Sequence, residues 1–211
     1  MSSPARPLVA VLDYGIGNLR SAEKALCRVG ADARLTADVG IVRDAVAVVL
    51  PGVGAFGACM RALRATALED PALDAVASGR PFLGICIGMQ MLFETSAEDE
   101  GAKGLGVIAG DVEWIPGDVK RPQMQWNRLH VVRPDDPAFR GAARDPWMYF
   151  VHSLHAVPAE PSVVTATCDY GGPVTAAVWQ GNVLACQFHP EKSGRNGLAY
   201  LQRFVAALPA A

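Results

Sequence analysis

The stretch "PFLGICIGMQMLFE", residues 81–94, carries the strongest structural signal in the chain. A short apolar run typical of a buried strand passes at once into a segment with helical spacing. Cys86 stands at the junction, with Gly84 and Gly88 two residues away on either side. Gly-x-Cys-x-Gly is the cysteine form of the nucleophile elbow, a sharp and strained strand-to-helix turn at which flanking side chains would collide. The pentapeptide therefore predicts a nucleophile, with a buried packing cysteine as the alternative.

Strand-like and helix-like segments alternate on both sides of this junction, which indicates parallel strands joined by right-handed crossovers. The expected strands are residues 7–13, 31–35, 45–52 and 81–85, and the expected helices are residues 18–30, 55–68, 72–79 and 88–94. Beyond residue 100 the pattern becomes strand-like, with Gly, Pro and Asp turns. These later strands are 104–115, 127–132, 147–152, 162–171, 174–180 and 182–188, before an amphipathic helix at 197–208.

The predicted fold class is α/β: a doubly wound mixed sheet flanked by helices, parallel in the N-terminal half and extended by antiparallel strands. Neither a repeat nor a linker interrupts the pattern, so we expect a single domain over residues 1–211. We also expect Trp114, Trp147 and Trp179 to be core residues, as tryptophans in strand patterns usually are.

Composition excludes several classes of protein. The 211 residues are 51 % hydrophobic and 19 % charged, and the net charge is −2, so neither nucleic acid nor a membrane surface is an expected partner. The chain has neither a signal-peptide pattern nor an apolar run of membrane-spanning length. Five scattered cysteines without metal-ligand spacing predict a reduced, cytoplasmic protein that holds no metal and needs no cofactor.

A cysteine nucleophile needs a base, and His189 in "ACQFHPEKS" is the best candidate among four histidines. It follows a strand-like run, and active sites of open α/β sheets lie at strand ends. Pro190 favours an extended conformation for the residue before it. Glu191, two residues on, can then orient the imidazole. A surface His-Pro-Glu turn is the alternative reading of this tripeptide taken alone.

The loop "LPGVGAFG", residues 50–57, directly follows a buried strand and can turn backbone N–H groups towards a carbonyl oxygen. The N–H of Ile87, just after the nucleophile, is the other expected oxyanion donor. The same loop matches the dinucleotide fingerprint Gly-x-Gly-x-x-Gly, but no acidic residue follows at the end of a next strand, so we reject that reading. A plain tight turn remains the alternative.

With these residues in place, the chain resembles the class I (triad) glutamine amidotransferases, and more narrowly the glutaminase subunits of imidazole glycerol phosphate synthase. The stretches that carry the resemblance run through the whole chain. They are "DYGIGNLRS" (13–21), "LPGVGAFG" (50–57), "FLGICIGMQMLFE" (82–94), "GLGVIAGDV" (104–112), "MQWN" (124–127), "YFVHS" (149–153) and "QFHPEKSG" (187–194).

The resemblance implies a role for each matching residue. Cys86 would be the nucleophile, His189 the base and Glu191 its orienting acid, with Val53 and Ile87 as oxyanion donors. The implied glutamine-binding residues are Gly52, Gln90, Glu98, His152, Ser153 and Leu154. The implied partner-facing residues are Asn18, Trp126, Asn127, Tyr149 and Lys192.

The resemblance also implies a heterodimer with a (β/α)₈ cyclase subunit. Ammonia released from glutamine would pass to the cyclase, which makes imidazole glycerol phosphate and aminoimidazole carboxamide ribotide in histidine biosynthesis. Gln125 and Leu154 depart from the residues usual in that group, a glycine and an aromatic, and neither belongs to the triad.

Three alternatives stay open at this point. The chain could serve another acceptor, such as the glutaminase of the pyridoxal phosphate pathway, which the synthase it activates would reveal. It could be a binding protein that keeps the fold, in which case Cys86 would not react with a glutamine-analogue electrophile. It could also be a different cysteine hydrolase, acting on substrates other than glutamine.

Overall fold

The computed structural model describes residues 6–17, 19–142 and 145–209. The strands of the central sheet are β1 (Leu8–Leu12), β2 (Asp32–Thr36), β3 (Ala47–Gly52), β4 (Phe82–Cys86), β8 (His130–Val131), β11 (Val164–Asp169), β12 (Pro173–Gln180) and β13 (Val183–Cys186). Within the described segments this sheet has eight strands in the order β2-β1-β3-β4-β13-β12-β11-β8. Pairing is parallel from β2 to β13 and antiparallel from β13 to β8, so the predicted mixed, doubly wound sheet is confirmed.

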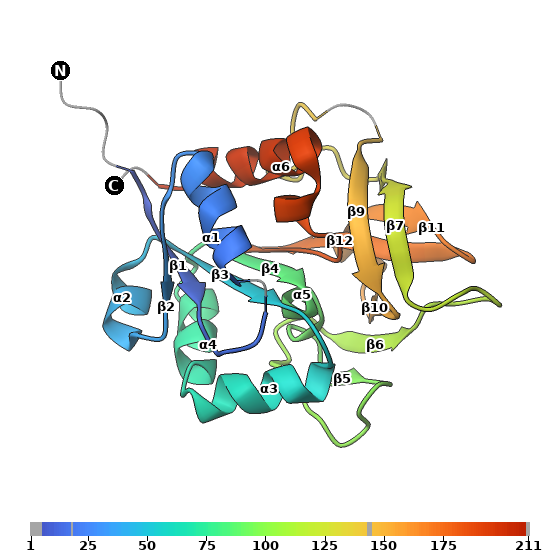
Figure 1. Ribbon diagram of the computed structural model, residues 1–211, viewed down its shortest axis with the longest axis horizontal. Helices are drawn as coiled ribbons and strands as arrows, with labels where there is room; N and C mark the ends of the chain where they lie inside the picture. Colours follow the sequence, from blue (N-terminus) through green and yellow to red (C-terminus); the bar gives the residue numbers. More distant parts are fainter. Residues whose placement is uncertain (1–5, 18, 143–144, 210–211) are drawn as a thin grey trace.

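Helices cover both faces of this sheet (Figure 1). They are α1 (Leu19–Arg28), α2 (Val39–Asp44), α3 (Phe56–Ala65), α4 (Glu69–Ala77), α5 (Ile87–Gln90) and α6 (Gly194–Ala206). In Figure 1, α1 and α6 lie together on one face, and α3 and α4 lie on the other. The inner strands β3, β4 and β13 are buried along their whole length, as expected for parallel strands covered on both faces.

The remaining strands of the described segments form smaller sheets beside the carboxyl ends of the parallel strands. They are β5 (Thr95–Ser96), β6 (Gly110–Trp114), β7 (Gln123–Arg128), β9 (Trp147–His152) and β10 (Leu154–Pro158). β10, β6 and β5 form one of these sheets, and the antiparallel pair β7-β9 forms another. In Figure 1 they stand at one end of the central sheet, and β9 and β10 supply Val151, His152 and Leu154 to the lining of the candidate site.

Two predicted elements are shorter than expected for a shared reason. The helix expected at 88–94 is only the single turn α5, and the strand expected at 104–115 is formed only by β6. The carbonyls of Met91, Leu92 and Phe93 accept hydrogen bonds from the N–H groups of residues 105–108 instead of continuing a helix. Tertiary backbone pairing therefore ends both elements, and no local propensity could have indicated it.

One α-helix, two strands and the 3₁₀ turns Pro161–Val163 and Pro190–Lys192 were not predicted, and one predicted strand is divided. α2 begins at Asp38, whose carboxylate caps the helix by accepting from the N–H groups of Gly40 and Ile41. β10 follows β9 after a break at Ser153, and β5 is only two residues long. The strand expected at 127–132 is split between β7 and β8, which belong to different sheets.

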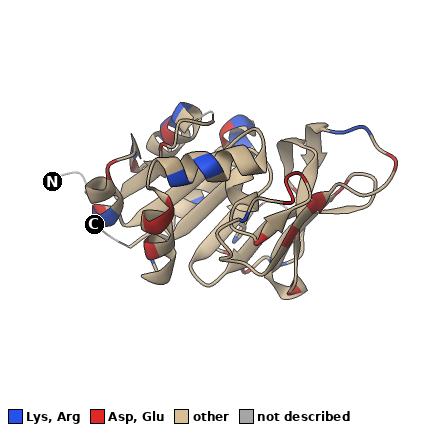
Figure 2. Cartoon of the chain, turned by 90° about the horizontal axis from the view of Figure 1, so that it is seen from below, with Lys and Arg blue, Asp and Glu red and all other residues tan. Residues whose placement is uncertain are grey.

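Trp114 and Trp147 were wrongly expected in the core, since they are 47 % and 53 % exposed. No helix in the described ranges is long and apolar enough to cross a bilayer. Basic and acidic residues are interspersed over the drawn elements rather than gathered on one face (Figure 2).

Candidate active site

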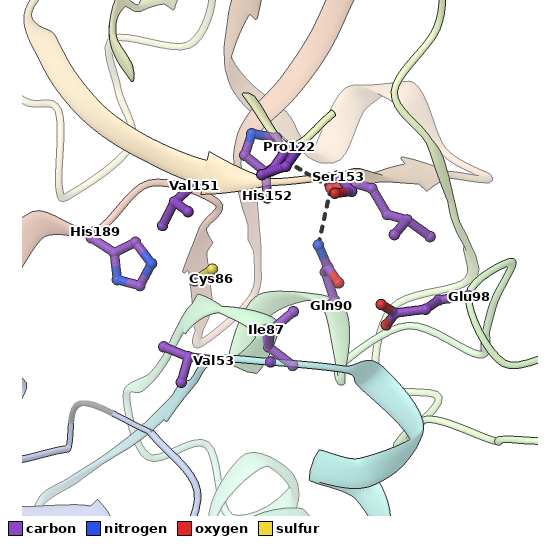
Figure 3. A pocket seen from close by; sticks show the side chains of 12 residues that line it. Val53, Cys86, Ile87, Gln90, Glu98, Pro122, Val151, His152, Ser153 and His189 are labelled. Carbon is purple, nitrogen blue, oxygen red and sulfur yellow. Dashed lines mark hydrogen bonds between the residues drawn. The ribbon is translucent and has the colours of Figure 1, made fainter. Parts of the chain in front are cut away.

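Cys86 is the last residue of β4 and directly precedes α5. Its backbone has φ 56° and ψ −111°, a left-handed φ that costs a non-glycine residue of the order of 1–3 kcal/mol. Such strain at the end of a central strand is the geometry of a nucleophile elbow. It turns the Cys86 side chain out of the sheet and into a cavity beyond the strand ends (Figure 3).

The two glycines near Cys86, Gly84 and Gly88, are required because backbone atoms lie very close to both of them. A Cβ on Gly84 would lie 2.9 Å from the carbonyl oxygen of Gly88, inside the turn of α5. A Cβ on Gly88 would lie 1.7 Å from the carbonyl oxygen of Leu50 in β3. The elbow thus needs glycine at both positions because α5 is pressed against its own strand and against the neighbouring strand.

His189 lies where β13 leads out of the sheet, next to β4, so parallel pairing brings it beside Cys86. Its backbone is extended, with φ −98° and ψ 96°, as predicted for a residue before proline. The next three residues form a 3₁₀ turn (Pro190–Lys192), which returns the Glu191 carboxylate to the ring. His189 Nδ1 lies 2.8 Å from Glu191 Oε1, and both side chains are almost fully buried. The extended backbone thus ends at His189, and the 3₁₀ turn that follows it brings Glu191 back to the ring.

Backbone and hydroxyl contacts fix this turn in place. The N–H of His189 donates to the carbonyl of Tyr149 in β9, at 3.0 Å. The buried Ser193 hydroxyl donates to the His189 carbonyl at 2.6 Å and accepts from the N–H of Tyr149 at 2.9 Å. A Cβ on Gly197 would lie 1.9 Å from the carbonyl oxygen of Pro190, so only glycine lets α6 approach the turn so closely. The base is thus held from three directions.

Electrostatics favour a charged His189. Burial disfavours the imidazolium, but interactions with Cys86 and Glu191 outweigh it and raise the pKa of His189 to about 10. Because Nδ1–H donates a hydrogen bond to Glu191, the other ring nitrogen, Nε2, is the one free to exchange a proton with a reacting group. Nε2 has no hydrogen-bond partner among the described residues, and the ring lies beside the Cys86 sulfur (Figure 3). This arrangement can protonate a leaving group and later activate water.

Two side chains hold the loop after β3 through hydrogen bonds to its backbone carbonyls. The buried Tyr14 hydroxyl donates to the Pro51 carbonyl at 2.6 Å, and the Cys59 thiol donates to the Val53 carbonyl at 3.3 Å. Burial raises the pKa of Tyr14 far above its usual range, so its hydroxyl remains a donor at any ordinary pH. At the far end of the loop, Glu98 accepts from the N–H of Phe56 at 2.7 Å. Neither Tyr14 nor Cys59 was predicted to touch this loop.

These elements enclose a cavity of about 240 Å³. It is smaller than the roughly 300–1,000 Å³ of pockets for drug-sized ligands, which suits a molecule of amino-acid size. Its lining residues come from the ends of β3, β4 and β13, from α5, and from the neighbouring β9 and β10 (Figure 3). They are Val53, Gly54, Cys86, Ile87, Gln90, Glu98, Pro122, Val151, His152, Ser153, Leu154 and His189.

The structure thus brings most of the predicted site residues to one cavity. Gly52 and Glu191 are the exceptions: they line a much smaller space behind His189. A Cβ on Gly52 would lie 2.6 Å from the Tyr14 hydroxyl, so this glycine makes room for the loop anchor. The lining residues that sequence reasoning missed are Gly54, Pro122 and Val151, which carry no reactive group by which it could have found them.

The carbonyl of Leu154 sets the direction of two polar side chains above the cavity. It accepts from His152 Nδ1 at 2.7 Å and from Gln90 Nε2 at 3.1 Å. Since a carbonyl only accepts, His152 must carry its proton on Nδ1. Burial, opposed only in part by this hydrogen bond, lowers the pKa of His152 to about 4, so the ring is neutral at pH 7. Gln90 also donates to Gln187 Oε1 at 2.9 Å, which leaves only its own oxygen to face a ligand.

The predicted partner-facing residues partly gather on the β7-β9 pair. Trp126 and Tyr149 are cross-strand neighbours whose ring centroids are 6.0 Å apart, and Trp126 is 47 % exposed. Lys192 is exposed in the adjacent turn. The amide of Asn127 instead donates to the Asp169 carbonyl at 2.9 Å, so its side chain is turned to β11. Asn18 lies outside the described residues.

Two neighbouring features bear on the expectations. The side chain of Gln125, which replaces the usual glycine, is exposed on β7, so its bulk meets solvent. In the portions of the chain described, no three His, Cys, Asp or Glu side chains gather in a way that could hold a metal ion. The lining of the cavity contains neither Lys nor Arg, the side chains that would bind a cofactor phosphate.

Comparison with known proteins identifies the family to which the chain belongs. The model of the family "Glutamine amidotransferase class-I" matches residues 10–208. The Rhodopirellula baltica protein "Imidazole glycerol phosphate synthase subunit HisH" is 48 % identical over 202 residues, covering 95 % of this chain and 98 % of that protein. The protein of the same name from Syntrophotalea carbinolica is 48 % identical over 204 residues, covering 93 % of this chain and 98 % of that protein.

A solved structure described as "Crystal structure of glutamine amidotransferase" shares the fold. It superposes with a TM-score of 0.74 at 23 % identity, over 94 % of this chain and 99 % of that one. The elbow at Cys86, the buried His189–Glu191 pair and these matches agree with one another. The chain therefore belongs to the class I glutamine amidotransferase family and, within it, to the HisH subunits of imidazole glycerol phosphate synthase.

Proposed function

We propose that this chain is the glutaminase subunit of an imidazole glycerol phosphate synthase, which hydrolyses glutamine to glutamate and ammonia. The observation that carries the proposal is the strained elbow at Cys86 beside the buried His189–Glu191 pair. The HisH names of relatives that match nearly the whole chain support the acceptor pathway, histidine biosynthesis.

The first half of the reaction uses the groups in the order in which they surround the cavity. The Cys86 thiolate attacks the side-chain amide carbon of glutamine, and the negative oxygen that forms faces the N–H groups of Val53 and Ile87. His189 then delivers its Nε2 proton to the amide nitrogen, the C–N bond breaks, and ammonia leaves a thioester on Cys86. Glu191 keeps the ring oriented and stabilises its charge.

The second half regenerates the enzyme. His189, now neutral, takes a proton from water, the hydroxide adds to the thioester carbon, and the C–S bond breaks to release glutamate. Gln90 and Glu98 hold the α-amino group through acceptor oxygens, since the amide hydrogens of Gln90 are already engaged by Leu154 and Gln187. Residues His152 to Leu154 complete the glutamine site.

Ammonia would be protonated and lost in water, so the proposal includes a second subunit that consumes it. We assign that role to a (β/α)₈ cyclase subunit, which docks over Trp126, Tyr149 and Lys192 and makes imidazole glycerol phosphate and aminoimidazole carboxamide ribotide. Asn127 lies beside Trp126 on β7, and a partner contact at Asn18 stays a prediction from the resemblance. We further propose a single catalytic domain acting in the cytoplasm, which the five unpaired cysteines favour.

The test is glutamate release from glutamine, measured with and without the cyclase subunit and its nucleotide substrate. We expect strong stimulation by the complete system, and a loss of at least about 10⁴-fold in Cys86→Ala. The variant should still support synthesis from added ammonium, since the cyclase site is intact. Cys27→Ala is the matched control, because Cys27 is half-buried in α1, away from the cavity lining.

Retained glutamine use in Cys86→Ala would refute the nucleophile. If the complex forms but the wild type remains inactive, the acceptor is wrong. The assay is then repeated with the synthase subunit of the pyridoxal phosphate pathway.

A further inference from the structure

Gln187 is a fully buried amide that the proposed reaction does not use. It lies between the end of β13 and His189, and its backbone N–H donates to the Ala176 carbonyl at 2.9 Å. Its side-chain Nε2 is 3.7 Å from the Cys86 sulfur, within hydrogen-bond distance for a sulfur acceptor. A fully buried amide costs free energy unless it is hydrogen-bonded, so its partners define what it does.

The direction of this amide is dictated from outside the catalytic residues. The Leu154 carbonyl can only accept, so the NH₂ group of Gln90 must face it, at 3.1 Å. The same NH₂ group donates to Gln187 Oε1 at 2.9 Å. Gln187 is therefore an acceptor towards Gln90 and must turn its own NH₂ group to Cys86. A chain of donors runs from a fixed backbone carbonyl to the sulfur, and no member can reverse without placing two acceptors face to face.

Other sources of stabilisation for a negative sulfur are limited. The dipole expected from a seven-residue helix is reduced, because α5 is a single turn of four residues. Among side-chain donors, His189 gives one ring nitrogen to Glu191 and offers Nε2 alone to the sulfur. During the reaction that Nε2 proton leaves with the ammonia, whereas the amide hydrogens of Gln187 stay.

We propose that Gln187 donates a hydrogen bond to the Cys86 sulfur that favours the thiolate and aims it into the cavity, with its direction set by Gln90. The inference rests on the proposed function, in which Cys86 is the nucleophile. Donors to a charged acceptor contribute about twice as much as donors to a neutral one, so loss of this donor should move the protonation midpoint upward by roughly one pH unit.

The charge on the sulfur also depends on the ionisable groups around it. These are His189 from the turn after β13, Tyr14 from the loop after β1, Cys59 from α3 and Cys186 from β13. Gln187 is neutral, so exchanging it for another neutral side chain leaves those groups unchanged.

The experiment measures the rate at which iodoacetamide alkylates Cys86 in the full chain as a function of pH, without glutamine or a partner. Mass spectrometry follows the tryptic peptide 65–103, which contains no other cysteine, since trypsin does not cleave between Arg80 and Pro81. Gln187→Met is similar in size but has no donor. In this variant the pH at which the alkylation rate of Cys86 is half-maximal should rise by about one unit. In Gln187→Glu, nearly isosteric but an acceptor, it should rise further. Gln202→Met, on the exposed side of α6, is the matched control and should not move it.

A midpoint in Gln187→Met that equals that of the wild type, with native circular dichroism, would overturn the proposal. If that variant does not fold, Gln187→Glu decides: an unchanged or lowered midpoint would overturn it equally. Because alkylation needs no glutamine, the two proposals fail separately. A shifted midpoint in a chain without glutaminase activity would support the Gln187 hydrogen bond and reject the function.

Discussion

His152 should make the protein acid-sensitive, and the size of the effect follows from its surroundings. The ring is buried, donates from Nδ1 to the Leu154 carbonyl, and has a pKa of about 4 instead of the ordinary 6.5. The unfolded chain therefore binds a proton that the folded chain refuses at pH values between these two. Folded-state stability from this group is present above pH 6.5 and is lost as pH falls towards 4. Between pH 7.5 and pH 5 the loss is roughly 2 kcal/mol.

The perturbation is His152→Asn, whose amide nitrogen can occupy the place of Nδ1 and keep the donor to Leu154. Urea unfolding would be measured for both proteins at pH 7.5 and at pH 5, and the free energies of unfolding compared. The wild type should lose about 2 kcal/mol more than the variant on acidification. His155, whose burial also lowers its pKa, is present in both proteins and cancels from this comparison.

The contribution of His189 to stability changes with pH in the opposite direction, and it also cancels from the comparison of wild type and variant. Its pKa is raised to about 10, so its contribution is complete below 6.5 and is lost as pH rises towards 10. Equal losses in wild type and His152→Asn on acidification would refute the reasoning, because His152 would then titrate alike in the folded and unfolded chains.

Three further changes test other parts of the site. Gly88→Ala forces a Cβ to within 1.7 Å of a backbone carbonyl and should lower the free energy of unfolding by about 4 kcal/mol or more, whereas Gly101→Ala, whose nearest atom would be 3.7 Å away, should change it by less than about 1 kcal/mol. Glu191→Gln removes the charge beside the base and should lower glutaminase kcat by roughly 10²-fold or more with a smaller change in KM; an unchanged kcat would exclude the orienting role. Trp126→Ala should weaken binding of the cyclase subunit by roughly 30-fold in Kd, measured by calorimetry, while unfolding stays unchanged.

Sequence reasoning succeeded where one local rule and the fold agreed. The segment leading to Cys86 predicted the strand, the elbow and the need for glycines at once. The His-Pro-Glu motif correctly predicted a histidine at the end of a strand. Parallel pairing of β4 with β13 then brought the two together, as strand ends of one sheet must come together. Trp126 kept its predicted place on an exposed face.

It failed where a tertiary contact replaced a local one. The helix expected after Cys86 stops after one turn because its next carbonyls bind a distant loop segment. Gln187 carried no signal, since an amide beside a strand end reads as an ordinary polar residue until its neighbours are known. Trp147 was assigned to the core by its strand pattern. Within the described residues, however, β9 belongs to a two-stranded sheet with β7, and Trp147 is 53 % exposed.

The order of strands in the sheet also governs when the site can exist. β13, which delivers His189, is the last strand of the described chain, yet it sits inside the sheet between β4 and β12. A nascent chain therefore carries Cys86 without His189 beside it until β13 has been made and has paired with β4. The β4 edge stays open until β13 inserts, and its pairing with a strand so distant in sequence is a slow, non-local step. Cys86 and His189 therefore lie side by side only in a chain whose central sheet has closed around β13.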